Sequence, residues 1–198
     1  MAVTADQVKE LRERTGAGMM ECKKALVESQ GNFDRAVDLL RKSGIARAES
    51  RAARAASEGL VESYIHPGNR VGVLIEVNCE TDFVARTPEF VDLVRNLAMQ
   101  VAAAGAEVVR REDLPAERVE RERAIFAAQM EGQKKPPAIV EKIVAGKLEK
   151  FYSEICLLEQ PFIRDDKKTV GELVKEASAR TGENIQVRRF ARFRLGQE

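Results

Sequence analysis

Few residues of this 198-residue chain have the chemistry that catalysis needs. The single histidine, His66, stands before a Pro-Gly pair typical of a turn, and a general base would also need a nucleophile and an orienting group. Three carboxylates, Glu76, Glu80 and Asp82, stand near the end of an expected strand, but acid–base catalysis there would need a pocket as well. The sequence lacks a glycine-rich phosphate loop, a dinucleotide fingerprint and a nucleophile elbow. These features argue against an enzyme.

The three cysteines, Cys22, Cys79 and Cys156, are far apart and each stands among apolar residues. We expect free core thiols, as in proteins of the reducing cytoplasm. With one histidine and no Cys-x-x-Cys pair, neither a structural zinc site nor a cofactor is expected. There is no secretory signal and no apolar run of membrane-spanning length, so we expect a cytoplasmic protein that does not enter a membrane.

The charge balance gives little reason to expect a nucleic acid as the main partner. The chain has 33 Lys and Arg against 32 Asp and Glu, and its formal net charge is +1. Two segments are nonetheless basic, and we interpret them as solvated faces of a helix and a strand. They contain Arg41, Lys42, Arg47, Arg51 and Arg54 in one segment, and Arg188, Arg189, Arg192 and Arg194 in the other.

The segment Thr81-Asp82-Phe83-Val84 stands out because it joins an expected strand to an expected helix and contains a bulky aromatic residue. Phe83 allows two interpretations. General residue frequencies favour a ring that packs on the protein's own core. Alternatively, the ring is an exposed wedge beside an acidic residue, since large aromatics in surface loops are natural interface anchors. The residue types alone do not decide between the two.

The first 44 residues have the pattern of three short helices. A Thr-x-x-Gln capping box starts the first helix at Thr4, and a Thr-Gly-Ala-Gly stretch interrupts it. The second helix is expected over about 19–30, and the third ends near Gly44. Such a small bundle is typical of a binding module, because its core is too small to enclose a catalytic cleft as well. Residues 45–57, rich in Ala, Arg and Ser, are expected to form a polar helical linker.

The remainder predicts strands mixed with helices. Period-two alternation indicates a hairpin with strands near 60–65 and 71–79, and a closing strand near 185–195 with a bulge at about Arg188. A short strand is expected near 108–109, and Thr87 with the following proline starts a helix. The expected helices cover about 88–104, 115–131, 137–158 and 170–181.

We therefore predict an α+β protein with two domains. Residues 1–50 would form a three-helix partner-docking domain and the start of the linker. Residues 51–198 would form an α+β core, with a three-stranded antiparallel sheet and helices, that contains the Thr-Asp-Phe-Val turn.

Several segments resemble the elongation factor Ts family, in family order from end to end. Residues 8–26 (VKELRERTGAGMMECKKAL) resemble its amino-terminal domain, and residues 76–86 (EVNCETDFVAR) resemble its second signature. The segments GKLEKF, LLEQPF and RFARFRLG, at 146–151, 157–162 and 189–196, resemble its carboxy-terminal part. The resemblance implies that the first bundle is similar to a ubiquitin-associated domain.

The resemblance also implies a function. Members of the family are non-enzymatic guanine-nucleotide exchange factors of translation, which bind elongation factor Tu·GDP, disturb its Mg²⁺ and phosphate site and promote GDP release. In the family the Thr-Asp-Phe-Val turn enters the partner near its magnesium site and the aromatic ring helps to dislodge the ion. The matching residues here are Thr81, Asp82, Phe83 and Val84.

A second contact is implied for the amino-terminal domain, which docks on a helix of the partner's nucleotide-binding domain. The candidate docking residues are Met19, Met20 and Lys23. Both methionines fit the small core equally well, because methionine readily fills such cores.

The chain resembles the short, single-core form of the family, which implies a homodimer. Three other classes remain open: a non-catalytic adaptor that uses the bundle, a basic ribosome- or RNA-associated factor, and an enzyme. Accelerated release of labelled GDP from elongation factor Tu would distinguish the exchange factor from all three.

Overall fold

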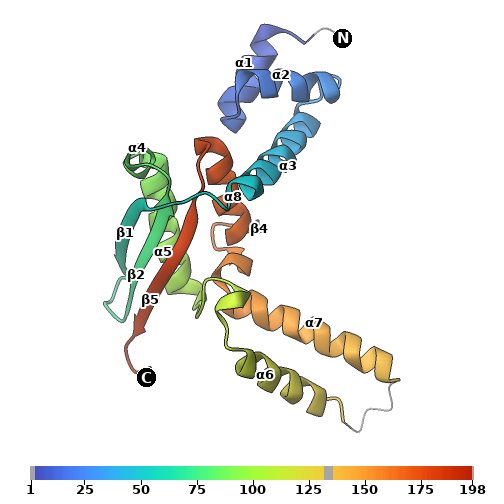
Figure 1. The fold of residues 1–198 in the computed structure, drawn as a ribbon, viewed down its shortest axis with the longest axis vertical. Coiled ribbons are helices and arrows are strands. Elements are labelled where there is room, and N and C mark those ends of the chain that lie inside the picture. The colour runs from blue at the N-terminus through green and yellow to red at the C-terminus, as the bar shows by residue number, and fades with distance from the viewer. Residues whose placement is uncertain (1–2, 132–135, 198) are drawn as a thin grey trace. The chain divides into compact units, whose positions relative to one another are not determined.

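A computed structural model describes residues 3–131 and 136–197 of the chain (Figure 1). Its contacts divide the chain into two compact units, each assembled from three segments. The first unit comprises Met1–Gly59, Asn78–Phe90 and Glu172–Gln186. The second comprises Leu60–Val77, Val91–Gly171 and Val187–Glu198. The prediction that residues 1–50 form a separate domain is not tested by this division.

The first unit begins with three helices, α1 (Ala5–Thr15), α2 (Met19–Glu28) and α3 (Phe33–Arg51). The predicted capping box is confirmed: the Thr4 side chain accepts a hydrogen bond from the Gln7 amide, and the Gln7 side chain accepts one from the Thr4 amide. Gly16, with φ of 68°, ends α1 in the left-handed conformation that glycine adopts without strain.

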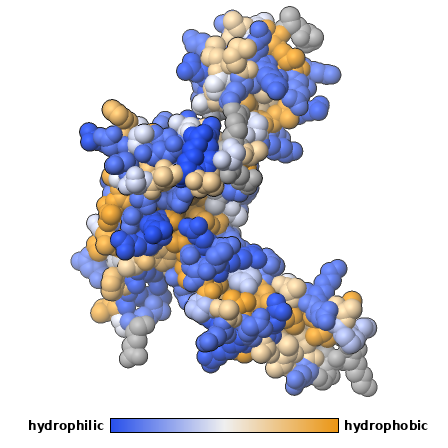
Figure 2. All heavy atoms as spheres, viewed as in Figure 1, coloured by the Kyte–Doolittle hydropathy of each residue, from blue (hydrophilic) through white to orange (hydrophobic). Residues whose placement is uncertain are grey.

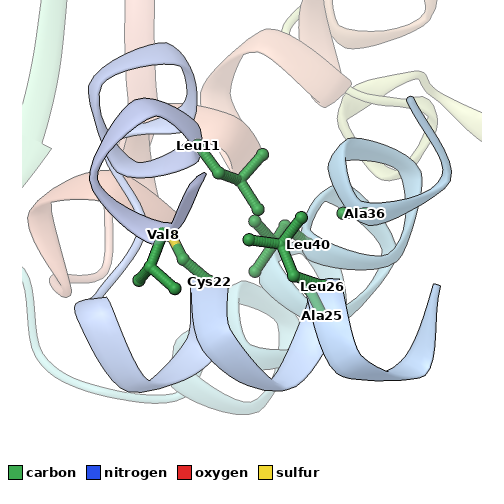
Figure 3. Close-up of a cluster of buried hydrophobic side chains, with 7 residues drawn as sticks. All are labelled: Val8, Leu11, Cys22, Ala25, Leu26, Ala36 and Leu40. Carbon is green, nitrogen blue, oxygen red and sulfur yellow. The ribbon is translucent and has the colours of Figure 1, made fainter. Parts of the chain in front are cut away.

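One apolar cluster holds these helices together (Figure 3). Its fully buried members come from all three helices: Val8, Leu11, Cys22, Ala25, Leu26, Ala36 and Leu40. Because the cluster has only a handful of side chains, it resembles a small binding module more than an enzyme core.

The predicted end of the third helix near Gly44 is wrong, because α3 continues to Arg51. Gly44 lies where the helix packs closely on α8 (Val170–Thr181): a Cβ atom at this position would approach the Cβ of Ala179 to 3.1 Å. The glycine therefore permits close helix packing and does not stop the helix. Ala48 is also buried, so part of the expected linker contributes to the packed structure.

A three-stranded antiparallel sheet forms as predicted, with the order β1 (Glu58–Ile65), β2 (Val71–Cys79) and β5 (Gln186–Arg194). Along β2 the buried positions alternate strictly with more exposed ones from Val73 to Cys79. In β5 the alternation breaks at Arg188 and Arg189, which are both exposed, at the place where the sequence predicted an interruption.

Helix α5 (Pro88–Ala104) supplies a large share of the buried side chains. Its start is capped as predicted, since the Thr87 hydroxyl accepts a hydrogen bond from the Phe90 amide at 3.3 Å. Its buried residues include Phe90, Leu93, Val94, Leu97 and Val101. Figure 1 shows α5 running along the sheet.

The rest of the second unit includes a helical hairpin of α6 (Ala116–Ala128) and α7 (Pro137–Ile155), both somewhat shorter than predicted. The expected strand near residues 108–109 is a single parallel bridge between Val108 and Cys156. The sequence did not predict the short hairpin of β3 (Pro161–Phe162) and β4 (Asp165–Thr169), because β3 has only two residues and the polar β4 lacks alternation. Two short 3₁₀ helices, Arg111–Asp113 and Leu157–Glu159, complete the structure.

Candidate functional site

The 81–84 turn, formed by Thr81, Asp82, Phe83 and Val84, leaves the end of β2 and begins the short helix α4 (Asp82–Ala85). Thr81 is the N-cap of this helix, and its hydroxyl accepts a hydrogen bond from the Val84 amide at 3.4 Å. The four candidate residues are therefore one structural element, as their order in the chain predicted. Both the turn and its supporting residues lie within the first unit.

Phe83 is exposed over 81% of its surface, so the interpretation of its ring as a core residue is wrong. Complete burial of a phenylalanine side chain is worth about 1.5–3 kcal/mol relative to exposure in water. The free protein does not gain this energy from Phe83. A partner that encloses the ring would gain it, and aromatic side chains of this kind are common interface anchors.

The carboxylate of Glu183 holds the base of the turn. One oxygen accepts hydrogen bonds from the amides of Glu80 at 3.0 Å and Thr81 at 3.1 Å. The other accepts a hydrogen bond from the Thr81 hydroxyl at 2.6 Å. Hydrogen bonds to an ionised acceptor are about twice as strong as those between neutral groups, so this contact fixes the backbone where the strand changes into the helix.

A second set of contacts surrounds the first. The carboxylate of Glu80 accepts a hydrogen bond from the amide of Asn184 at 2.6 Å and pairs with Arg54 at 3.5 Å. The amide side chain of Asn184 in turn donates to the carbonyl oxygens of Arg54, at 2.7 Å, and Ala52, at 3.3 Å. Residues 80–81, 183–184 and 52–54, distant in the sequence, thereby form one hydrogen-bonded group.

Cys79 also contacts this hydrogen-bonded group. Its thiol is buried and donates to the carbonyl oxygen of Thr81 at 3.2 Å. Burial, with a contribution from the nearby charge of Glu183, raises the pKa of Cys79 to about 11. The thiol is therefore protonated at neutral pH and acts as a packed hydrogen-bond donor, in agreement with the prediction of a core thiol.

The three carboxylates considered for acid–base chemistry each pair with an arginine: Glu76 with Arg189 at 2.7 Å, Glu80 with Arg54, and Asp82 with Arg86 at 2.9 Å. His66 lies in the exposed hairpin turn, where its Nδ1 is 3.2 Å from the Tyr64 hydroxyl. Among the described residues, no group of three or more His, Cys, Asp or Glu side chains could hold a metal ion.

The second candidate surface lies on α2. Met19 is 44% exposed and Met20 is 75% exposed, so the structure places both methionines at the surface of the bundle and not in its core. Lys23 is exposed as well, and Val27, one turn further along, is 59% exposed. Met20, Lys23 and Val27 follow helical spacing and form one partly apolar stripe.

A cavity of about 330 Å³ lies elsewhere in the first unit. It is lined by the loop between α1 and α2, by α3 and by α8, and includes four arginine side chains. One of them, Arg41, pairs with Glu176 at 3.2 Å, and another, Arg51, donates to the carbonyl of Ser178. None of the four residues of the 81–84 turn lines this cavity.

Sequence reasoning found the turn but not the residues that hold it. Glu183 and Asn184 follow the glycine at the end of α8, a place where polar residues are expected for turn formation alone. Their partners lie between 102 and 132 positions earlier in the chain, and no spacing rule connects these segments. Within the described residues, no helix is both long and apolar enough to cross a bilayer.

Comparison with known proteins places the chain in a family. The family model described as "Elongation factor TS" matches residues 42–197. The chain is 60% identical over 195 residues to elongation factor Ts of Anaeromyxobacter sp. (strain Fw109-5), covering 98% of this chain and 89% of that protein. It is 59% identical to elongation factor Ts of Moorella thermoacetica, covering 98% and 96%, and 55% identical to that of Thermodesulfovibrio yellowstonii, covering 100% and 98%. The chain therefore belongs to the elongation factor Ts family.

Proposed function

We propose that this protein binds elongation factor Tu·GDP in the cytoplasm and promotes release of GDP, so that GTP can bind. In this proposal the 81–84 turn enters the partner beside its Mg²⁺ and phosphate site, and the protein acts without a cofactor and without enzymatic chemistry. The single observation that carries the proposal is the exposed ring of Phe83 on a turn whose base is fixed by hydrogen bonds.

The geometry of the turn suits a wedge. The ring has no large packing contact to lose when it enters a partner, because it is mostly exposed in the free protein. The backbone behind it is already ordered by Glu183 and by the Thr81 cap, so binding costs little conformational entropy there. The carboxylate of Asp82 stands next to the ring and offers negative charge near a partner's metal ion.

The thermodynamics require coupling between two ligands of the partner. If this protein weakens the binding of GDP to Tu, then GDP must weaken the binding of this protein to Tu in the same ratio. The protein must therefore bind the nucleotide-free GTPase most tightly and be displaced when GTP binds. This requirement needs no nucleotide site on the protein itself.

We assign a docking role to Met19, Met20 and Lys23 on α2. All three side chains are exposed on the small helical cluster that begins the first unit, and flexible methionine side chains adapt readily to a partner surface. Docking there would hold the protein on the partner while the 81–84 turn acts. It would contribute affinity, whereas Phe83 would contribute to the rate of GDP release.

We also propose that the protein is a homodimer. Exposed apolar residues occur on the three strands of the sheet and just after the last of them: Val61, Ile65, Leu74, Phe193 and Leu195, each at least 50% exposed. Apolar residues are visible among hydrophilic ones over the sheet in Figure 2. An exposed apolar sheet face is a typical site of association, and a two-fold axis would cover the same face of both copies.

The direct test is release of labelled GDP from elongation factor Tu. Catalytic amounts of this protein should accelerate release, and high Mg²⁺ concentration should reduce the acceleration. The reference is the rate at which preformed Tu·GDP releases GDP without added protein. No acceleration at any Mg²⁺ concentration, with a folded protein and an active GTPase, would rule the proposal out.

A further inference from the structure

The short helix α4 cannot set its own direction. It has four residues, whereas isolated helices shorter than about 12–15 residues are marginal in water. Phe83 is mostly exposed, so it has little packing contact that could orient it. The direction of the ring therefore depends on what holds the backbone at Thr81, where the helix starts.

The Thr81 hydroxyl is the link between α4 and the rest of the unit. It accepts a hydrogen bond from the Val84 amide, inside α4, and donates one to Glu183, outside it. The same carboxylate also accepts hydrogen bonds from the amides of Glu80 and Thr81. Glu183 thus determines both the backbone path into α4 and the orientation of its cap.

Glu183 is itself firmly placed. Its carbonyl oxygen accepts a hydrogen bond from the hydroxyl of Ser178. The neighbouring Asn184 is only 3% exposed and donates hydrogen bonds to Glu80 and Arg54. A carboxylate on such a fixed backbone positions its partners more accurately than one on a mobile loop.

We infer that Glu183 is a positioning residue for nucleotide exchange, which acts by holding the 81–84 turn so that Phe83 is presented in one direction. The inference rests on the proposed function of that turn. Misplacement of a working group by about 1 Å can cost as much as 10²-fold in rate, so loosening the turn should slow exchange without removing any residue that contacts the partner.

The test uses Glu183→Gln in the full-length protein. Glutamine keeps the size of the side chain but lacks the charge, and only one of its terminal atoms is an acceptor. We expect GDP release from Tu to slow by about ten-fold, which corresponds to about 1.4 kcal/mol in the exchange transition state. The matched control is Glu159→Gln in the second unit, where a part-buried carboxylate accepts hydrogen bonds from Arg111; this variant should exchange at the wild-type rate.

A double variant separates positioning from a general loss of stability. If Glu183 acts through the ring, adding Glu183→Gln to Phe83→Ala should slow exchange little beyond Phe83→Ala alone. Two independent effects would instead multiply. Multiplied effects, or wild-type exchange by Glu183→Gln, would overturn the inference.

A second readout does not depend on exchange activity. Hydrogen exchange of the Glu80 and Thr81 amides in the free protein should accelerate by about ten-fold or more in Glu183→Gln, while amides of α5 keep their protection. Unchanged protection at both amides would overturn the inference. If the amides lose protection but Phe83→Ala does not affect GDP release, the proposed function of the turn fails, while Glu183 is still shown to hold it.

Discussion

Phe83 and Phe90 are close neighbours in the chain and both lie near the start of a helix, yet they have opposite environments. Phe83 is 81% exposed, and Phe90 is 1% exposed. Phe90 belongs to a helix whose apolar residues recur at helical spacing, so burying one of them buries the whole face. Phe83 lies in a four-residue helix with no such face. The comparison shows that the aromatic residue outside any periodic pattern is the one available to a partner.

The largest effect should come from removing the buried ring. Phe90→Ala would leave a cavity beneath α5 and should lower the free energy of unfolding by about 3–5 kcal/mol. Urea denaturation, followed by circular dichroism, measures the change. If this variant unfolds like the wild type, the contrast between the two phenylalanines is lost.

Removing the exposed ring should have the complementary effect. Phe83→Ala should change the free energy of unfolding by less than about 0.5 kcal/mol, because no buried contact is lost. GDP release from Tu should slow by roughly thirty-fold, the equivalent of about 2 kcal/mol for a buried interface anchor. The control is Ile139→Ala, which shortens a half-exposed apolar side chain on α7. This variant should release GDP from Tu at the wild-type rate. A large stability loss with normal exchange would return Phe83 to a structural role.

The apolar sheet face offers the next largest effect. Leu74 is 50% exposed in the middle of β2, and Leu74→Lys would place a charge in the proposed dimer interface. The dimer dissociation constant should rise by about ten-fold or more, since an unpaired charge would be desolvated on association. Sedimentation across a concentration series measures it, starting from the monomer mass of 22.0 kDa. A wild-type protein that sediments as a monomer at micromolar concentration would remove the proposal.

The smallest effect is expected from the carboxylate beside the ring. Asp82→Ala should slow GDP release by about three-fold, the size of a modest electrostatic contribution, and the deficit should depend on Mg²⁺ concentration. Because Asp82 pairs with Arg86 at 2.9 Å, Arg86→Ala separates loss of this ion pair from loss of the carboxylate. If both variants are equally slow, the ion pair and not the partner's metal explains the effect.

Local patterns predicted much of the fold. The capping box at Thr4, the cap at Thr87 and the alternation along β2 each depend on residues within a few positions of one another, and each is confirmed. The end of α3 was missed because Gly44 was interpreted from its own helix propensity alone. Its close approach to Ala179 is a tertiary contact that no local pattern could show.

The sequence by itself determined the family, the order of the elements and the identity of the four residues in the 81–84 turn. These depend on residue types and on short-range periodicity. Only the tertiary structure decided whether Phe83 lies in the core or at the surface, and which residues hold the turn. The reason is physical: the hydrogen bonds that the Glu183 carboxylate accepts from Glu80 and Thr81 join residues about a hundred positions apart, and the pairing depends on how the chain folds back on itself.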